Sequence, residues 1–308
     1  MICAYCGHES KVTKEHIISS SVLDLFPECF LTIDRVRGTQ HLTDPVIKDV
    51  CIECNNKKIS YIDSYSRQLI SKYFISNYKK NDRLDFTYSY SLVQKVLLKY
   101  AYNDSRSYKK DTSFFTRDIL DFLMDETTTD SLTNVTVMAG LAINLTPWAT
   151  FMFGNEKITW GRDPYFFSRS IVEVNYKTSQ IYYRNNNLQQ KFKSLNFSYL
   201  FRFNSVQFLL MCWNPDITNE DLEENDMLLH QYPYTILSGR GHDFLSRCTS
   251  EGTYFIPMLI DVRYGQEVYD NITTLREYSS STSQKQFFKD KEEEWIKEEK
   301  ILSKKYPR

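Results

Sequence analysis

Two C-x-x-C pairs constrain the fold of this 308-residue chain more than any other feature of the sequence. The first pair is Cys3 and Cys6, and the second is Cys51 and Cys54. In each pair the spacing lets two thiolates hold adjacent corners of a tetrahedral Zn²⁺ ion. Four such ligands leave no open position for water or substrate, so we expect a structural zinc site. The alternatives are a chance recurrence of the spacing and a redox site.

The segment between the two pairs, residues 7–50, is longer than the linker of a simple zinc ribbon, in which about 15 to 20 residues separate the pairs. The zinc ion would therefore close a loop that has a structure of its own. Three further cysteines, Cys29, Cys212 and Cys248, stand alone, and we expect them to be buried and inert.

Two short stretches around this loop carry polar residues of chemical interest. Residues 13–18, TKEHII, suggest a polar turn that enters an extended, β-branched run. A Glu-His pair in isolation is usually explained by a surface strand with a hydrogen-bonded imidazole. Directly after the second cysteine pair, Asn55 stands where apolar residues begin to recur at helical intervals. An Asn at a helix start is usually only a cap.

Taken together, the stretches C-x-x-C, K-E-H-I-I and V-C-x-x-C-N-N-x-K resemble the HNH endonuclease family. The active site of that family is a ββα-metal unit, in which a two-stranded hairpin and a helix surround one divalent ion. Its zinc-bearing branch brackets this unit with two C-x-x-C knuckles. The resemblance implies an N-terminal HNH nuclease domain at residues 1–75, with the four cysteines as its zinc site.

The resemblance also implies a role for each matching residue. His16 corresponds to the general base that takes a proton from the attacking water. Glu15 and Asn55 correspond to the protein ligands of a catalytic Mg²⁺ or Mn²⁺ ion, whose Lewis acidity stabilises charge on the phosphate and on the leaving oxygen. A helix N-terminus nearby would assist phosphate binding. The basic residues expected to contact nucleic acid are Lys14, Lys57 and Lys58.

Two departures from the family pattern affect the strands. The family has an Asn shortly before the second cysteine pair that fixes the His-bearing loop, but residues 44–51, DPVIKDVC, contain none. Either Asp49 or a backbone carbonyl would have to replace it, or the loop is not fixed in this way. After Ile18, where relatives have Pro and a Gly-Gly turn, Ser19-Ser20-Ser21 and VLDLFPECFL indicate an inserted turn or strand. His8 is expected in a solvated turn, with a contact to zinc or phosphate as the alternative, and His41 is either structural or a phosphate contact.

The remainder of the chain, residues 76–308, is expected to form a larger mixed α+β domain that selects a target or binds a partner. It would be helical over 76–130 and strand-rich over 134–280, with a buried central strand at 206–213. Gly239-Arg240-Gly241-His242 indicates a turn. A charged helix at 284–305 would dock on its own domain or on another protein. The fold class of the whole chain is therefore expected to be α+β.

Charge restricts how such a protein could hold nucleic acid. The formal net charge is −1, so binding would depend on a local basic patch. Residues 72–110 carry nine basic and three acidic residues, a net charge of +6. They form either a phosphate-contacting surface or an ordinary solvated helix face.

The composition and the N-terminus bear on the compartment. No apolar run reaches the roughly 18 residues that a membrane span needs, and Cys3 and Cys6 stand where a signal peptide would begin. We expect a cytoplasmic protein without a membrane partner. Its expected substrate is DNA, with RNA not excluded, and a regulatory protein subunit is a further partner hypothesis. Stand-alone bacterial proteins of this build suggest, by analogy, a role in defence against phage or in mobile elements.

A second hypothesis treats the chain as a binding module rather than an enzyme. A zinc-stabilised fold could use the same surface to hold nucleic acid or protein without cleaving it. The joint presence of Glu15, His16 and Asn55 favours the enzyme, because a binding module needs no such combination.

Overall fold

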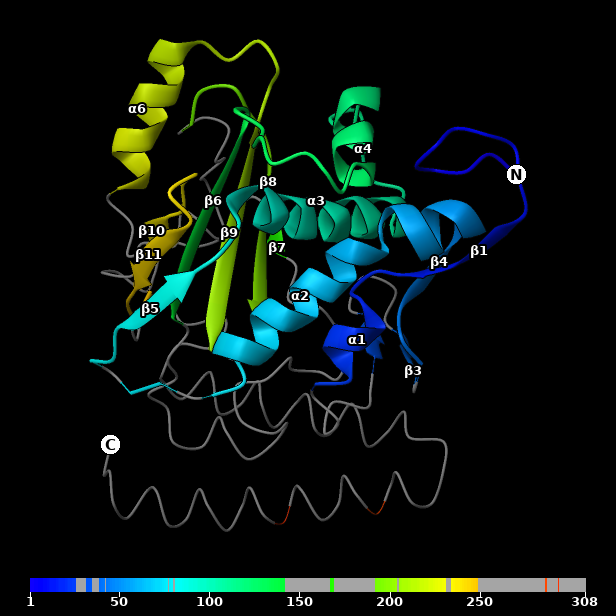
Figure 1. The fold of residues 1–308 in the computed structure, drawn as a ribbon, viewed down its shortest axis with the longest axis horizontal. Coiled ribbons are helices and arrows are strands. Elements are labelled where there is room, and N and C mark those ends of the chain that lie inside the picture. Colours follow the sequence, from blue (N-terminus) through cyan, green and yellow to red (C-terminus); the bar gives the residue numbers. More distant parts are fainter. Residues whose placement is uncertain are drawn as a thin grey trace.

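The computed structural model describes residues 1–25, 32–34, 39–41, 43–76, 78–79, 81–141, 167–168, 192–203, 205–230 and 234–248, together with Gln286 and Glu293. It contains both helices and sheets (Figure 1), which confirms the α+β class. Apart from those two residues, the expected C-terminal helix at 284–305 lies outside the described part, as do Cys29 and most of the expected strands between 142 and 191.

The N-terminal part is built on two antiparallel strands, β1 (Val12–His16) and β4 (Val46–Cys51), in which His16 lies opposite Val46. The polar residues expected to form a turn are thus the strand itself. The last paired residue of β1 is His16, and Ile17 and Ile18, which follow it, are buried.

The expected insertion after Ile18 is present. It begins with the single helical turn α1 (Ser20–Leu23) and continues into the antiparallel pair β2 (Thr32–Asp34) and β3 (Thr39–His41). Val22 and Leu23 of α1 are buried, and α1 contacts helix α2 (Ser60–Tyr73). The first turn of the inserted segment therefore packs on the helix that follows the second cysteine pair.

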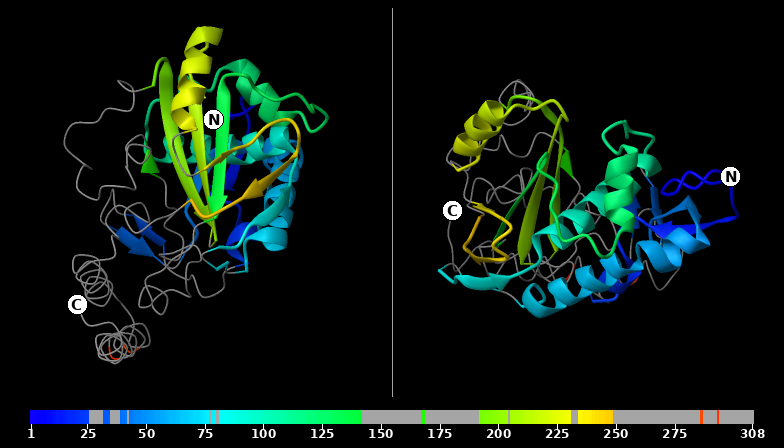
Figure 2. Two further views of the ribbon diagram at one scale, coloured as in Figure 1. Left: turned by 90° about the vertical axis from the view of Figure 1, so that its left-hand side faces the viewer. Right: turned by 45° about the horizontal axis from the view of Figure 1, so that its top comes forward.

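Three α-helices follow β4 in the chain and pack on one another. The helix expected to begin near Asn55 is confirmed, although its start is a separate π-helical turn, η1 (Cys54–Lys58), that precedes α2. After α2 come α3 (Tyr90–Ser107) and α4 (Arg117–Met124), as the apolar periodicity predicts. Figure 2 shows α3 between the N-terminal strands and a larger sheet, and its residues contact β4 on one side and β6 on the other.

The larger sheet is antiparallel with the strand order β10-β6-β9-β8-β7. Its strands are β6 (Val135–Leu141), β7 (Phe167–Ser168), β8 (Leu195–Phe203), β9 (Val206–Trp213) and β10 (Thr235–Ile236). All eight residues of β9 are buried, which confirms the predicted central strand. Along β9, residues 208, 210 and 212 belong to the core shared with α3, whereas residues 209, 211 and 213 pack with Leu229 of α6 (Asn219–Leu229). Both faces of the sheet are thus covered.

A small sheet outside this layer joins β5 (Leu84–Thr87) to β11 (His242–Leu245). A strand at 84–87 was not expected in the helical region. The predicted glycine-rich turn precedes β11, and Gly241 there has a φ of +70°. A Cβ atom at Gly241 would lie 2.9 Å from the Tyr88 carbonyl oxygen, so both the backbone conformation and the available space require glycine.

A large apolar core cluster joins the N-terminal part to one face of the larger sheet. It contains Cys3 and Ile62 from the N-terminal part together with Tyr100, Phe201 and Leu245. The core packing is continuous across residue 75. The domain boundary expected there stays a prediction. None of the described helices combines the length and the apolar character that crossing a membrane requires.

Candidate active site and metal centre

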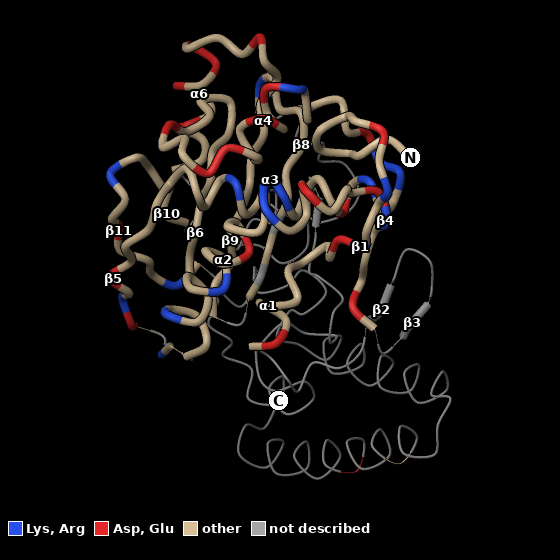
Figure 3. Tube along the Cα trace, turned by 45° about the vertical axis from the view of Figure 1, so that its right-hand side comes forward, with Lys and Arg blue, Asp and Glu red and all other residues tan. Residues whose placement is uncertain are grey.

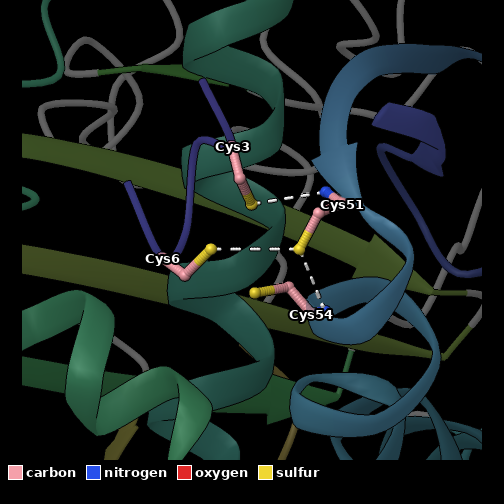
Figure 4. Close-up of side chains that lie close together, drawn as sticks. All are labelled: Cys3, Cys6, Cys51 and Cys54. Atoms are coloured by element: carbon pink, nitrogen blue, oxygen red, sulfur yellow. Dashed lines mark hydrogen bonds between the residues drawn. The ribbon is translucent and has the colours of Figure 1, made fainter. Parts of the chain in front are cut away.

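Four cysteine side chains converge between the N-terminal turn and the end of β4 (Figure 4). The sulfur atoms of Cys3, Cys6, Cys51 and Cys54 all lie within 4.8 Å of one another, and the Sγ atoms of Cys6 and Cys51 are 3.9 Å apart. A tetrahedral ion with Zn–S bonds of about 2.3 Å holds its sulfur atoms roughly 3.8 Å apart. The donor set and its spacing therefore fit a metal ion such as zinc, as expected.

Backbone hydrogen bonds favour negative charge at Cys3 of this cysteine cluster, whereas burial raises the pKa of the Cys6 and Cys54 thiols. Gly7, with a φ of +73°, donates its N–H to the Cys3 carbonyl at 2.9 Å and turns the chain back. The amide of Cys51 donates to Cys3 Sγ at 3.3 Å, and the amide of Cys54 donates to Cys51 Sγ at 3.4 Å. Burial alone would raise the pKa of the Cys3 thiol, but its backbone hydrogen bonds outweigh this effect and lower the pKa to about 7.

The cysteine cluster is anchored on α3 and α4 rather than on the strands alone. Tyr102 of α3 donates its hydroxyl to the Ala4 carbonyl at 2.9 Å. Arg117 of α4 donates to the Tyr5 carbonyl at 2.8 Å, and Tyr5 itself is fully buried. The described helices beyond residue 75 therefore hold the loop that carries the first cysteine pair.

His16 lies at the C-terminal end of β1 with its side chain about one third exposed, at 35%. Its Nε2 atom is 3.4 Å from Oδ2 of Asp44, a residue that precedes β4. The next amide, that of Ile17, donates to the Pro45 carbonyl at 3.0 Å. The imidazole thus stands at an accessible strand end, next to a carboxylate and with its backbone tied to the opposite strand.

Asn55 comes from η1 and reaches back to β1. Its amide nitrogen donates to Oγ1 of Thr13 and to the carbonyl oxygen of Lys14, both at 2.9 Å. Because these bonds use the nitrogen, a cation would be bound through the amide oxygen. The residue after the second cysteine pair therefore lies against the strand that carries Glu15 and His16.

The three lysines expected to contact nucleic acid are exposed around this point. Lys57 forms an ion pair of 3.0 Å with Glu53, four residues earlier on the surface. Figure 3 shows Lys and Arg positions near β4 and along α3, interspersed with Asp and Glu. The basic surface next to Asn55 consists of Lys14, Lys57 and Lys58.

Glu15 points away from solvent and is only 3% exposed. Its Oε1 atom is 2.8 Å from the ammonium of Lys99, which is also 2.6 Å from Oδ1 of Asp63 in α2. Burial would lower the pKa of Lys99, but the charges of Asp63 and Glu15 outweigh it and raise the pKa. Lys99 is therefore a charged partner between two carboxylates.

The catalytic Mg²⁺ or Mn²⁺ ion that the resemblance implies fits this arrangement only in part. Asn55 offers an amide oxygen beside exposed lysines. The contacted oxygen of Glu15, however, already faces an ammonium, which would repel a divalent cation at the same atom. Across the described residues no hydrogen bond or ion pair joins Glu15 to Asn55. The geometry thus brings the two segments together but does not assemble the expected pair of ligands.

The structure also shows what ties down the His-bearing segment in place of the missing Asn. Asp49 does not do so, because its carboxylate accepts from Arg106 of α3 at 2.6 Å. A backbone carbonyl does contribute, as expected, through the bond from Ile17 to Pro45. The second tie comes from a residue that the sequence did not suggest: Asn103 of α3 donates to the His16 carbonyl at 2.9 Å.

Part of the basic stretch at 72–110 is buried, which corrects its interpretation as a surface. Lys95 and Lys99 of α3 have no exposed area. Lys95 lies over the rings of Tyr61 and Phe122 and donates to the Asp125 carbonyl at 2.5 Å. These two lysines stabilise the interior and cannot contact phosphate.

Two further histidines and two further cysteines were considered in the sequence: His8, His41, Cys212 and Cys248. His8 is exposed in the turn that carries the first cysteine pair, and its carbonyl accepts from the Cys3 amide at 2.9 Å. The side chain of His41 is outside the described part. Cys212 and Cys248 are buried, as expected.

Sequence reasoning missed the polar residues that α2 and α3 contribute: Asp63, Lys99, Asn103 and Arg106. The three on α3 recur at i, i+4 and i+7, which is a signal for one helix face. A polar face is normally solvated, so the signal does not by itself indicate burial.

No protein-family model, curated protein or solved structure matches the chain.

Proposed function

We propose that this chain is a zinc-stabilised, metal-dependent endonuclease of the HNH type that hydrolyses phosphodiester bonds in DNA. The observation that carries the proposal is the bond from Asn55 to the Lys14 carbonyl. It joins the segment after the second cysteine pair to the strand that ends at His16. The residues that carry the resemblance are far apart in the sequence, and this contact brings their segments together.

In this proposal His16 accepts the proton of the attacking water. Asp44 faces its Nε2 atom at 3.4 Å and would orient the neutral imidazole. The carboxylate then stabilises the imidazolium that forms, as in other acid–base pairs of this kind. Asp44 is thus the orienting partner and His16 the base.

The exposed lysines beside Asn55 would bind the backbone phosphates that flank the scissile bond. Two of them, Lys57 and Lys58, are the last two residues of η1. When bound, a divalent ion would supply Lewis-acid stabilisation of the phosphate. Asn55 would hold it through Oδ1. Glu15 could serve as its second ligand only if the contact with Lys99 gives way, so we assign no step to that residue.

The competing function is a binding module without cleavage, and one observation favours it. The ion pair between Glu15 and Lys99 gives that acidic residue a purely structural role that any folded module could use. A binding module would hold DNA or RNA on the same lysines, and substitution of His16 would leave its function unchanged.

The experiment that separates the two functions is incubation of the purified, zinc-loaded protein with supercoiled plasmid, single-stranded DNA and RNA, each with Mg²⁺ or Mn²⁺ and with EDTA. Nicking or linearisation that requires the divalent ion supports the nuclease. Binding in a gel-shift assay without any cleavage of the three substrates supports the module. Cleavage of RNA alone would retain the reaction and change the substrate.

A further inference from the structure

Asn103 is a buried residue that contacts the backbone of His16 and uses both the oxygen and the nitrogen of its side-chain amide. It lies in α3, 87 positions from His16 in the sequence, and has no exposed area. Its Nδ2 donates to the His16 carbonyl at 2.9 Å and to Oε1 of Glu15 at 3.3 Å. Its Oδ1 accepts from the Tyr5 hydroxyl at 2.9 Å and from Nη2 of Arg106 at 2.5 Å. Both ends of this amide are therefore used.

The chemistry of the partners fixes the orientation of the amide. A guanidinium can only donate, so the atom of Asn103 that faces Arg106 must be the oxygen. A backbone carbonyl can only accept, so the atom that faces His16 must be the nitrogen. Because the two ends agree, the amide has one orientation that satisfies all of its partners.

This contact acts on the backbone of the residue whose side chain would carry the reaction. β1 ends at His16, and beyond it the chain leaves the sheet. The bond to the His16 carbonyl limits rotation of the peptide group at that end. A small rotation there would move the imidazole by a larger amount, and a displacement of about 1 Å can cost about 10²-fold in rate.

We propose that Asn103 is the positioning residue of His16, supplied by α3 from outside the cysteine-bracketed segment. The proposal rests on the proposed nuclease function for its effect on catalysis, but the contact itself can be tested without activity. It predicts that α3 belongs to the catalytic unit, so every experiment uses the full chain.

The variant that isolates the donor is Asn103→Asp, in which an oxygen replaces Nδ2 while the other oxygen can still accept from Tyr5 and Arg106. Its matched control is Gln94→Glu. Gln94 is a fully buried amide on the same helix, and its Nε2 donates to the carbonyls of Leu132 and Val135 at 3.0 and 2.9 Å. Both variants replace a buried amide by an acid, but only one touches His16.

For cleavage, we expect Asn103→Asp to lower kcat by about 10- to 100-fold with little change in KM, because the exposed lysines are untouched. Gln94→Glu, at equal zinc content, should retain the wild-type kcat. A folded Asn103→Asp protein with wild-type kcat would overturn the proposal.

A second readout does not depend on activity. The imidazole signals of His16, assigned by their loss in His16→Ala, should shift or broaden in ¹H–¹⁵N spectra of Asn103→Asp and not in those of Gln94→Glu. If the wild-type protein cleaves nothing, a change in these signals supports the positioning contact while the nuclease proposal fails. Unchanged signals overturn the contact itself.

If Asn103→Asp does not fold, the wild-type protein still decides the matter. The side-chain amide protons of Asn103, held by His16 and Glu15 in the interior, should exchange with solvent far more slowly than those of the exposed Asn56. Equal exchange rates for the two side chains would overturn the proposal.

Discussion

The ammonium of Lys99 lies 2.8 Å from Oε1 of Glu15, and neither side chain is more than 4% exposed. The same ammonium contacts Asp63 at 2.6 Å, so Lys99 of α3 joins strand β1, which carries Glu15 and His16, to helix α2. A buried charge is tolerated only with partners of opposite sign. The acidic residue next to the proposed base is therefore part of an internal ion-pair network.

Replacement of Lys99 by Met should destabilise the protein by about 3–5 kcal/mol, because it leaves two carboxylates without their buried partner. The matched control is Lys57→Met, which removes an exposed ion pair with Glu53 and should change stability by less than about 1 kcal/mol. Urea unfolding of both variants measures the difference. Similar losses for the two would show that the network around Lys99 contributes no more than a surface pair.

Removal of zinc should unfold the N-terminal part, because the cysteine cluster contributes directly to the core. We expect one zinc ion per wild-type chain and none in Cys54→Ser, measured by elemental analysis. Cys212→Ala, a buried cysteine in β9, is the control and should retain the metal. Hydrogen exchange after chelation should show loss of protection across residues 1–75. Retained protection there would contradict a structural role for the metal.

The lysines beside Asn55 should determine how binding depends on salt. Lys58→Ala should weaken DNA binding and reduce the slope of log Kd against log salt concentration by about 0.9 if the residue neutralises one phosphate. Lys193→Ala removes an exposed lysine that pairs with Glu224 at 2.7 Å and should leave the slope unchanged. Equal slopes for wild type and Lys58→Ala would exclude this residue from the interface.

Asp44 should matter for rate and little for stability. Asp44→Asn removes the negative charge next to Nε2 of His16, and we expect about a tenfold loss in kcat, which corresponds to about 1.4 kcal/mol in the barrier. Asp226→Asn is the control, since Asp226 lies at the same 3.4 Å from a ring nitrogen of His230 on the surface of α6. A tenfold loss in both variants would point to a general effect of charge.

The candidate metal site could be predicted from the sequence because the spacing of its cysteines is typical of zinc ligands. Cysteine pairs at a fixed separation predict the ligand set whatever the fold between them, and the four sulfur atoms do converge. The central strand β9 was predictable for a similar reason: an uninterrupted apolar run can be satisfied only where both faces are covered.

The environment of His16 was not accessible in the same way. Asn103 and Lys99 lie more than 80 positions from His16 and Glu15, which they contact. A polar helix face in the sequence does not by itself show whether it is buried or solvated. The nearby Asp49 was the natural substitute for a missing Asn, yet Arg106 binds it instead. Contacts that depend on how α3 packs against β1 and β4 require the tertiary structure.

The central claim is that His16 is the base of a phosphodiesterase reaction, and one comparison tests it most directly. Plasmid cleavage in Mg²⁺ or Mn²⁺ is measured for the wild-type protein, for His16→Ala and for His230→Ala, a surface histidine of the same type. The account predicts at least about a 10²-fold loss of rate for His16→Ala, with zinc content and fold unchanged, and the wild-type rate for His230→Ala. A folded, zinc-loaded His16→Ala protein that cleaves at the wild-type rate would contradict it.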